Sequence, residues 1–337
     1  MKNNKYLIQL LDGSVVRNRG GIKNTLERYN RLEELRYFGF RSRLYYFIQA
    51  LIAKFRNKFT DQVWKVTLKV RIDYKKIINV ELGDEKGGFF ADCFVRCNGD
   101  DSFILLFERY NPITSKGEIE YRVYRVNECD VELVFSKVIL ADSRCHYSYP
   151  AFIEVEQSAF SFSVESIDSG KLGVYKFDIE GNLLESFSLN GEYIDPYLLQ
   201  VPESKEWLLF YSMVSKPDEL VIQPIRLNNL KLERKGDACR ILNTWLARGG
   251  GDMSVRMVGD NLMQVTRYVQ LSLPVYGSDL VESKISLLRG EAGWKVEGFE
   301  VNTAFGSEVT SGIDVKGIHT FSSDENSKFS VLAYDWR

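Results

Sequence analysis

The pattern of apolar and polar residues divides the chain into two parts near residue 60. Residues 41–59 carry one apolar stripe at the spacing of an amphipathic helix, formed by Leu44, Phe47, Ile48, Leu51, Ile52, Phe55 and Phe59. Upstream, two β-prone runs on either side of Asp12 and Gly13 predict a hairpin. After residue 61, short runs of Val, Ile, Phe and Tyr alternate with Gly, Asn and Asp turns, which is typical of an all-β domain.

The β-rich part repeats one plan five times: a polar residue opens an apolar run, a turn follows, and a second run ends in a polar residue. The opening and closing residues are Asp92 and Glu108, Tyr149 and Glu165, Asp195 and Ser212, Asp252 and Arg267, and His319 and Asp335. A four-stranded propeller blade repeats every ~40–50 residues. The sequence therefore predicts an all-β fold, a five-bladed β-propeller over residues 61–337, with a basic, partly helical arm over residues 1–60.

Equivalent positions of a propeller converge on one axial funnel, so we expect the opening and closing residues to lie close together. A funnel with several carboxylates can host chemistry at glycosidic bonds, which needs one protonated and one ionised carboxyl group. Crowding separates the pKa values of such groups because like charges disfavour joint ionisation. The alternative is that the acids at blade openings cap turns and bind backbone amides of adjacent blades.

The net charge of −2 hides an asymmetry, because residues 1–60 carry +9 and the remaining residues −11. A basic arm predicts either an anionic partner, such as a lipid surface, or docking on the acidic body. Residues 41–59 fit a helix at a membrane interface, or a helix packed on the body or on a partner. The acidic body argues against nucleic acid binding by the propeller.

The composition, with 337 residues of which 45% are hydrophobic and 27% charged, indicates a globular protein of one or two domains. Five cysteines are too few, and odd in number, for a disulfide framework, which favours a reducing compartment. The longest nearly apolar run, 44–53, is shorter than the ~20 residues of a spanning helix, and residues 1–12 lack a secretion signal. We expect a cytoplasmic protein with peripheral contact to the inner face of the membrane through residues 41–59.

No cofactor and no metal ligands are predicted. Cys93 and Cys97 lie four positions apart in a predicted strand, which is not a zinc-binding spacing. A Ca²⁺ ion held by carboxylates of the funnel is the alternative.

Several motifs resemble the N-terminal domain of the plant glucosamine inositolphosphorylceramide transferase family and its bacterial relatives, some of them associated with formyltransferase domains. The motifs begin at Trp64, Ala91, Phe107, His146, Ile194, Arg267, Tyr276 and Gly317. That domain is similar to the five-bladed propellers of arabinanase- and xylosidase-type glycosidases. The resemblance implies that Asp92 stands where those enzymes keep a base, and Asp195 where they keep an Asp that modulates a pKa. The sequence departs from them at Asp252, where a later blade would supply a Glu as the acid, and at Cys93, which replaces a Pro.

Together these observations predict a carbohydrate-active protein that binds a glycan, a nucleotide sugar or a lipid-linked sugar. The predicted catalytic residues are Asp92, Glu165, Asp195 and Asp252. The predicted substrate-binding residues are Glu108, His146, Tyr149, Arg267, Gln270, Tyr276 and His319. The function predicted first is glycosyl transfer in surface polysaccharide or glycolipid biosynthesis. The alternatives are a glycoside hydrolase and a non-catalytic propeller that binds a glycan or positions a partner enzyme.

Overall fold

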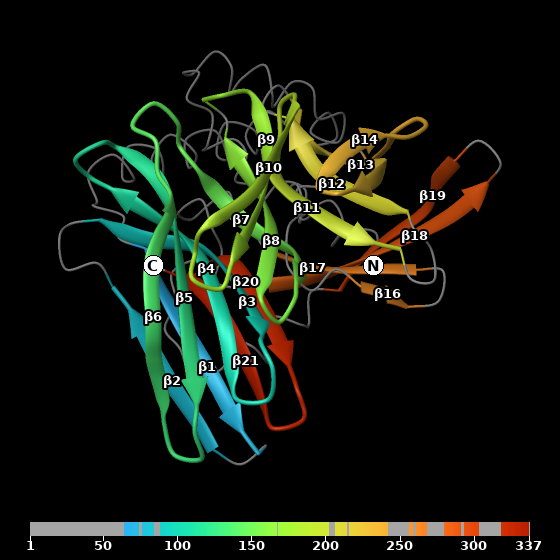
Figure 1. The fold of residues 1–337 in the computed structure, drawn as a ribbon. Helices are drawn as coiled ribbons and strands as arrows, with labels where there is room; N and C mark the ends of the chain where they lie inside the picture. Colours follow the sequence, from blue (N-terminus) through green and yellow to red (C-terminus); the bar gives the residue numbers. More distant parts are fainter. Residues whose placement is uncertain are drawn as a thin grey trace, which may run out of the picture.

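The computed structural model describes residues 64–73, 76–83, 88–166, 168–201, 206–213, 216–241, 256–258, 261–267, 280–290, 293–302 and 318–336. These residues form an all-β propeller built from five antiparallel sheets (Figure 1). The all-β propeller predicted from the repeat is therefore confirmed. The predicted arm over residues 1–60 lies outside the described residues, as do Asp252, Gln270 and Tyr276.

The first three blades follow one another along the chain. Blade 1 consists of β3 (Phe89–Cys97), β4 (Ser102–Asn111), β5 (Lys116–Val126) and β6 (Val131–Leu140). Blade 2 consists of β7 (Ser148–Val155), β8 (Ala159–Ser166), β9 (Lys171–Asp178) and β10 (Leu183–Asn190). Blade 3 consists of β11 (Ile194–Gln200), β12 (Trp207–Met213), β13 (Lys216–Asn228) and β14 (Lys231–Arg234), and β15 (Cys239–Ile241) also pairs with β13.

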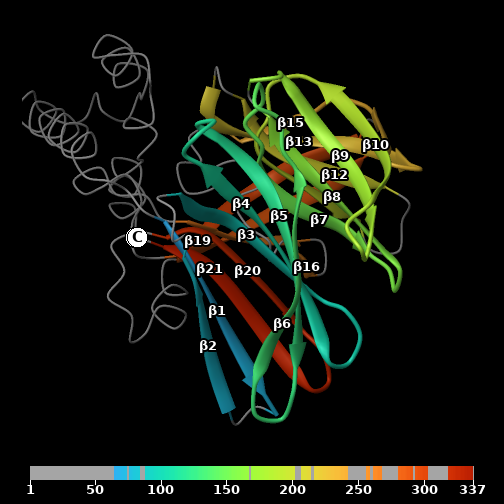
Figure 2. The ribbon, with the colours of Figure 1, turned by 60° about the vertical axis from the view of Figure 1, so that its left-hand side comes forward.

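The remaining strands form two further sheets. Blade 4 consists of β16 (Arg256–Val258), β17 (Asn261–Arg267), β18 (Leu280–Gly290) and β19 (Gly293–Asn302). Blade 5 joins β20 (Ile318–Glu325) and β21 (Phe329–Trp336) to β1 (Lys65–Ile72) and β2 (Lys76–Leu82). Strands from opposite ends of the described chain thus share one sheet, because β1 pairs with β21 over its whole length (Figures 1 and 2).

The repeat is visible in the backbone of the opening strands. The register of β3, β7, β11 and β20 shifts at the same point, where the opening residue of each segment stands. Asp92, Tyr149 and Asp195 have positive φ angles of 51°, 57° and 49° there. Such a β-bulge bends the strand and redirects its side chains. Since β20 contacts β3, β3 contacts β7, and β7 contacts β11, the bulges of consecutive blades lie next to one another.

Apolar side chains between adjacent blades hold this arrangement together. The strand β8 is buried at every position, which fits a strand in the middle of a layered β fold. Phe94 of blade 1 meets Tyr149 of blade 2 edge to face, with ring centroids 5.0 Å apart. Phe103 of blade 1 packs near Phe329 of blade 5. The cores between blades therefore fix the positions from which the bulges present their polar groups.

Candidate functional site

Buried acidic side chains gather where the bulges of the blades meet. Asp92, Glu108, Glu165, Asp195 and Asp335 are all at most 5% exposed. Burying a carboxyl group is costly unless hydrogen bonds or opposite charges compensate. The contacts of each group therefore determine what it can do chemically.

Asp335 and Asp92 connect three consecutive blades. The backbone N–H of Asp92 donates to Asp335 Oδ2 at 2.8 Å, and the N–H of Thr320 donates to Asp335 Oδ1. Asp92 in turn accepts hydrogen bonds from Thr320 Oγ1 at 2.9 Å and from the N–H of Tyr149 at 3.2 Å. These donors compensate for the burial of both side chains. The binding of amides in an adjacent blade, considered above as the alternative role of the acids, is thus observed for Asp92.

Glu165 forms the same kind of link between blades 2 and 3. Its Oε2 atom accepts the backbone N–H of Asp195 at 2.6 Å. The amide of each bulge residue, Asp92, Tyr149 and Asp195, is therefore bound by a carboxylate from the preceding blade.

Glu108 has a different partner. Its Oε1 atom lies 3.2 Å from His146 Nε2. The N–H of Gly117 donates to His146 Nδ1 at 3.0 Å, so Nδ1 is unprotonated and Nε2 carries the proton that points at Glu108. The loop that carries His146 is held further by the N–H of Tyr147, which donates to the carbonyl oxygen of Gly117 at 3.0 Å.

The electrostatics of this pair favour proton exchange near neutral pH. Burial raises the pKa of Glu108 to about 7, and Asp92 adds to the rise while His146 opposes it. For His146, burial acts to lower the pKa, but the hydrogen bond to Glu108 and the charges of Glu108, Glu165 and Asp92 outweigh it and the pKa is raised. The N–H donated to Nδ1 counteracts this rise, because only an unprotonated nitrogen accepts it. Carboxylates of blades 1 and 2 thus surround one histidine.

The other predicted residues are placed as follows. The ring of Tyr149 is buried against Phe94 in the core between blades. His319 lies in the bulge of β20, and Arg267 is the last residue of β17. The structure brings Asp92, Glu108, His146, Glu165 and Asp195 together through the contacts given above.

One equivalence drawn from the sequence is corrected by the strand register. Ala91 pairs with Glu108, Ser148 with Glu165, and Ile194 with Ser212, but Ile318 pairs with Trp336. Asp335 is therefore one position away from the closing residues of the other blades. Asp335 nevertheless accepts the amide of the bulge residue of the next blade, Asp92, as Glu165 accepts that of Asp195.

Two residues at this site were missed by the sequence reasoning. Thr320 is 1% exposed and joins Asp92 to Asp335, although nothing in the repeat distinguishes its hydroxyl. Gly117 lies so close to the pair that an added Cβ would meet the carbonyl oxygen of Tyr147 and would stand 2.8 Å from Glu108 Oε1. A glycine inside a strand pattern was the available signal, since it often marks a close approach of other groups.

Among the described residues there is no group of three or more His, Cys, Asp or Glu side chains placed to hold a metal ion. Oxygens of Asp92, Glu165 and Asp335 accept hydrogen bonds from backbone amides instead.

In the part of the chain that the structure covers, no helix has the length and apolarity to span a membrane.

Comparison with known proteins gives structural neighbours only. No protein-family model and no curated protein sequence matches the chain. An exo-β-1,3-galactanase from Clostridium thermocellum is 11% identical, with a TM-score of 0.49 over 79% of this chain and 57% of its own. A family 43 β-1,3-galactosidase with galactodeoxynojirimycin is 11% identical (TM-score 0.46; 77% of this chain, 85% of its own). A family 43 enzyme from Xanthomonas citri complexed with xylose is 10% identical (TM-score 0.43; 72% and 86%).

The all-β propeller described above has distant structural similarity to glycoside hydrolases of family 43. The resemblance to the glucosamine inositolphosphorylceramide transferase family stays a prediction from the sequence motifs.

Proposed function

We propose that this propeller is a carbohydrate-active enzyme that hydrolyses glycosidic bonds, with Glu108 as the proton donor. The observation that carries the proposal is the pair of Glu108 and His146, in which a buried carboxyl group has a pKa of about 7 beside a carboxylate, Asp92, that accepts several hydrogen bonds. Cleavage of a glycosidic bond requires this division into one protonated and one ionised carboxyl group.

His146 connects the proton donor to solvent. Its side chain is 33% exposed, whereas that of Glu108 is 6% exposed. After Glu108 has given its proton to the leaving oxygen, the carboxylate accepts a hydrogen bond from the Nε2–H of His146 until it regains a proton from water at the mouth of the site.

The ionised partner must stand across the scissile bond from Glu108. The carboxyl groups are roughly 5 Å apart in retaining enzymes and 6.5–9.5 Å apart in inverting ones. Asp92 shares a hydrogen bond with Glu108, so it is too near for this role and is proposed to stabilise developing positive charge. We assign the role of ionised partner to Asp195 or Glu165, with Asp252 as a further proposed catalytic residue, around one mouth formed by five blades.

Hydrolysis is preferred to transfer because of the charge at the site. A nucleotide sugar or a phosphate-linked lipid brings negative charge, which clustered carboxylates repel. A neutral glycan and a water molecule meet no such barrier.

The decisive experiment measures turnover of a panel of 4-nitrophenyl glycosides and neutral oligosaccharides by the wild type, Glu108→Gln and Asp195→Asn. Loss of a general acid or its partner should lower kcat about 10²–10⁴-fold. Glu132→Gln, an exposed carboxylate on β6, is the control and should turn over substrate at the wild-type rate. Unchanged kcat in both test variants would refute the mechanism.

A non-catalytic role is the second candidate, because three carboxylates bind amides of neighbouring blades. In that case the wild type should bind oligosaccharides in calorimetry without cleaving them, and Glu108→Gln should bind them equally well. Cleavage of any substrate that depends on Glu108 would exclude this candidate.

Glycosyl transfer in surface polysaccharide or glycolipid synthesis, with residues 41–59 on the inner face of the membrane, is a separate proposal that rests on the sequence. Cationic residues near anionic lipid contribute about 1 kcal/mol each. In flotation with anionic liposomes, the full chain should be found in the liposome fraction, and the protein that lacks residues 1–60 should not. Equal recovery of the two would end this proposal.

A further inference from the structure

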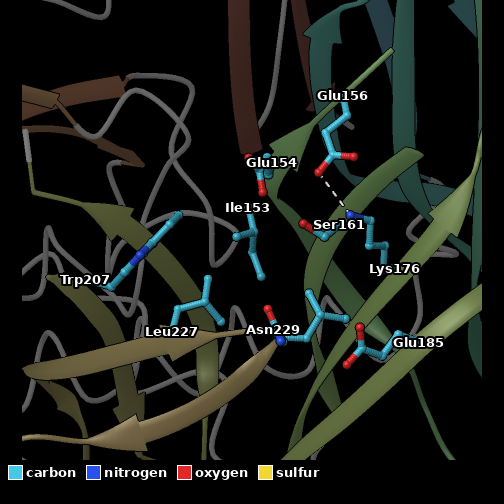
Figure 3. A pocket seen from close by; sticks show the side chains of 10 residues that line it. Ile153, Glu154, Glu156, Ser161, Lys176, Glu185, Trp207, Leu227 and Asn229 are labelled. Atoms are coloured by element: carbon cyan, nitrogen blue, oxygen red, sulfur yellow. Dashed lines mark hydrogen bonds and ion pairs between the residues drawn. The ribbon is translucent and has the colours of Figure 1, made fainter. Parts of the chain in front are cut away.

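A cavity lies between blades 2 and 3, away from the carboxylate site. It has a volume of about 400 Å³ (Figure 3). Blade 2 contributes Ser161 of β8, whereas Glu165 at the other end of the same strand belongs to the site described above. Four residues of a strand span about 13 Å. Beside them on β9, Val174 and Leu172, the partners of Ser163 and Glu165, are buried in an apolar cluster with side chains of blade 3, so the cavity is separate from the candidate active site.

One row of paired residues supplies the polar side of the cavity. Glu154 of β7 pairs with Ser161 of β8, Ser161 with Lys176 of β9, and Lys176 with Glu185 of β10. Directly paired residues share a face of the sheet, so all four side chains face blade 3. Neighbouring strands are about 4.8 Å apart, which puts the backbones of the two glutamates about 14 Å apart.

The polar groups of this row are only partly satisfied. Lys176 Nζ pairs with Glu156 Oε1 at 3.0 Å. Over the described ranges, the carboxylates of Glu154 and Glu185 and the hydroxyl of Ser161 have no hydrogen-bond or ion-pair partner. Ser161 is 3% exposed and its hydroxyl points into the cavity (Figure 3). A buried hydroxyl ordinarily has a partner, so this group is open to a ligand.

Blade 3 supplies an apolar wall opposite the row. Trp207, Leu227 and Leu230 line it. Leu230 and Asn229 form the two-residue turn between β13 and β14, with φ angles of 61° and 47°. Leucine rarely adopts a left-handed backbone conformation because its Cβ is crowded there. The conformation is maintained by burial of the Leu230 side chain, which forms part of the wall.

We propose that this cavity binds a linear polyamine with an ammonium group at each end and an amine between them. Three glutamates and one lysine give the lining a net charge of −2, and its two unpaired carboxylates stand at opposite ends of one row. The ammonium groups pair with Glu154 and Glu185, and Ser161 Oγ accepts a hydrogen bond from an amine between them. The methylene stem lies along the apolar wall, where Trp207 adds a cation–π contact. A neutral sugar could stack on Trp207 but would leave both carboxylates unpaired.

The test is calorimetric titration of the full chain with spermidine at low ionic strength, with 1,7-heptanediol as an uncharged probe of similar length and butylamine as a monocation. Spermidine should bind with a 1:1 stoichiometry and more tightly than butylamine, and heptanediol should not bind. Glu154→Gln and Glu185→Gln should each weaken binding about 2–5-fold, the range expected for ion pairs at an accessible site. Trp207→Leu should weaken binding to a similar degree.

Glu132→Gln removes a carboxylate of blade 1 that is also exposed and should leave spermidine affinity unchanged, which separates binding in the cavity from general attraction to an acidic protein. Thermal unfolding of each variant verifies that the fold persists. The proposal is overturned if spermidine does not saturate the wild type, if the double variant Glu154→Gln/Glu185→Gln binds it equally well, or if heptanediol binds as tightly as spermidine.

Discussion

Glu108 and Glu165 occupy the same position in the strand register of consecutive blades, but they bind different partners. Glu165 Oε2 accepts the amide of Asp195 at 2.6 Å, whereas Glu108 Oε1 lies 3.2 Å from His146 Nε2. The amide that Glu108 would otherwise bind, that of Tyr149, donates to Asp92 instead. Blade 1 thus contributes two carboxylates where one is enough to join it to blade 2, and the second is available for proton chemistry.

The first prediction concerns the pH dependence of stability in Glu108→Gln. The pKa of Glu108 is about 7 in the folded protein and 4.5 ordinarily, so between these values the folded state holds more protons than the unfolded state and stability falls as pH rises. The raised pKa of His146 acts in the same direction. The variant lacks the Glu108 contribution, so its stability relative to wild type should increase by roughly 3 kcal/mol from pH 4.5 to pH 7.5.

Urea unfolding of both proteins at pH 4.5, 5.5, 6.5 and 7.5 measures this difference. Glu132→Gln serves as the reference for a carboxylate exposed on β6. A difference between Glu108→Gln and wild type that stays constant with pH would show that Glu108 titrates at its ordinary value.

The second prediction concerns Gly117→Ala. The new Cβ would stand 2.8 Å from Glu108 Oε1 and would press against the carbonyl oxygen of Tyr147. Both groups must move, which breaks the hydrogen bonds that orient His146. We expect a loss of about 1–3 kcal/mol in stability, as for overpacking elsewhere, and a fall in kcat larger than any change in KM.

Gly83 offers the matched comparison, because an added Cβ there meets no atom within 4 Å. Gly83→Ala should keep wild-type stability and turnover. If Gly117→Ala also kept wild-type stability and turnover, the close approach of Gly117 to Glu108 would not matter for function.

The third prediction concerns Asp335→Ala. This side chain is fully buried and accepts the amides of Asp92 and Thr320. Its removal takes away the acceptor of these two buried N–H groups and should cost about 2–5 kcal/mol. Asp324→Ala removes a partly exposed carboxylate that accepts the part-buried amide of Cys97 and the exposed amide of Glu325, and it should cost less. Equal losses in the two variants, measured by urea unfolding, would contradict a special role for the buried link.

The fourth prediction is a small effect. Asp168 accepts hydrogen bonds from Lys116 Nζ at 2.5 Å and from the N–H of His146 at 3.2 Å, but its side chain is 38% exposed. Exposed ion pairs contribute about 0–1 kcal/mol, and an asparagine oxygen can still accept the amide. Asp168→Asn should therefore change the free energy of unfolding by less than about 1 kcal/mol. A larger change would mean that the loop before β7 depends on this pair.

The sequence predicted the blades because a repeat with fixed spacing leaves few other folds. It also predicted that acids from distant segments meet, and Asp92, Glu108, Glu165 and Asp195 do so. The hydrogen-bond partner of each acid could not be predicted from the sequence. Asp335 differs from the other closing residues by one position in the strand register. The spacing between the opening and closing residues of a segment varies from 15 to 17, so it cannot reveal a shift of one residue.

The special backbone of the bulges was also not predictable from residue type. Asp92 and Asp195 are common choices for a positive φ, but Tyr149 is not. The conformation of Tyr149 is imposed by two contacts with blade 1. Its backbone N–H donates a hydrogen bond to Asp92, and its ring packs against Phe94 in the core. Tertiary contacts of this kind leave no trace in the local sequence.

The sheet that unites β1 and β2 with β20 and β21 has a consequence for biosynthesis. As the chain leaves the ribosome, β1 emerges long before its neighbour β21. Until β21 is made, the backbone N–H and C=O groups on that edge of β1 have no strand to pair with. Asp335, which holds the amides of Asp92 and Thr320, arrives with that last strand. A nascent or truncated polypeptide lacking β21 would therefore expose an aggregation-prone strand edge. It would also lack the carboxylate that binds the amides of the first and last blades.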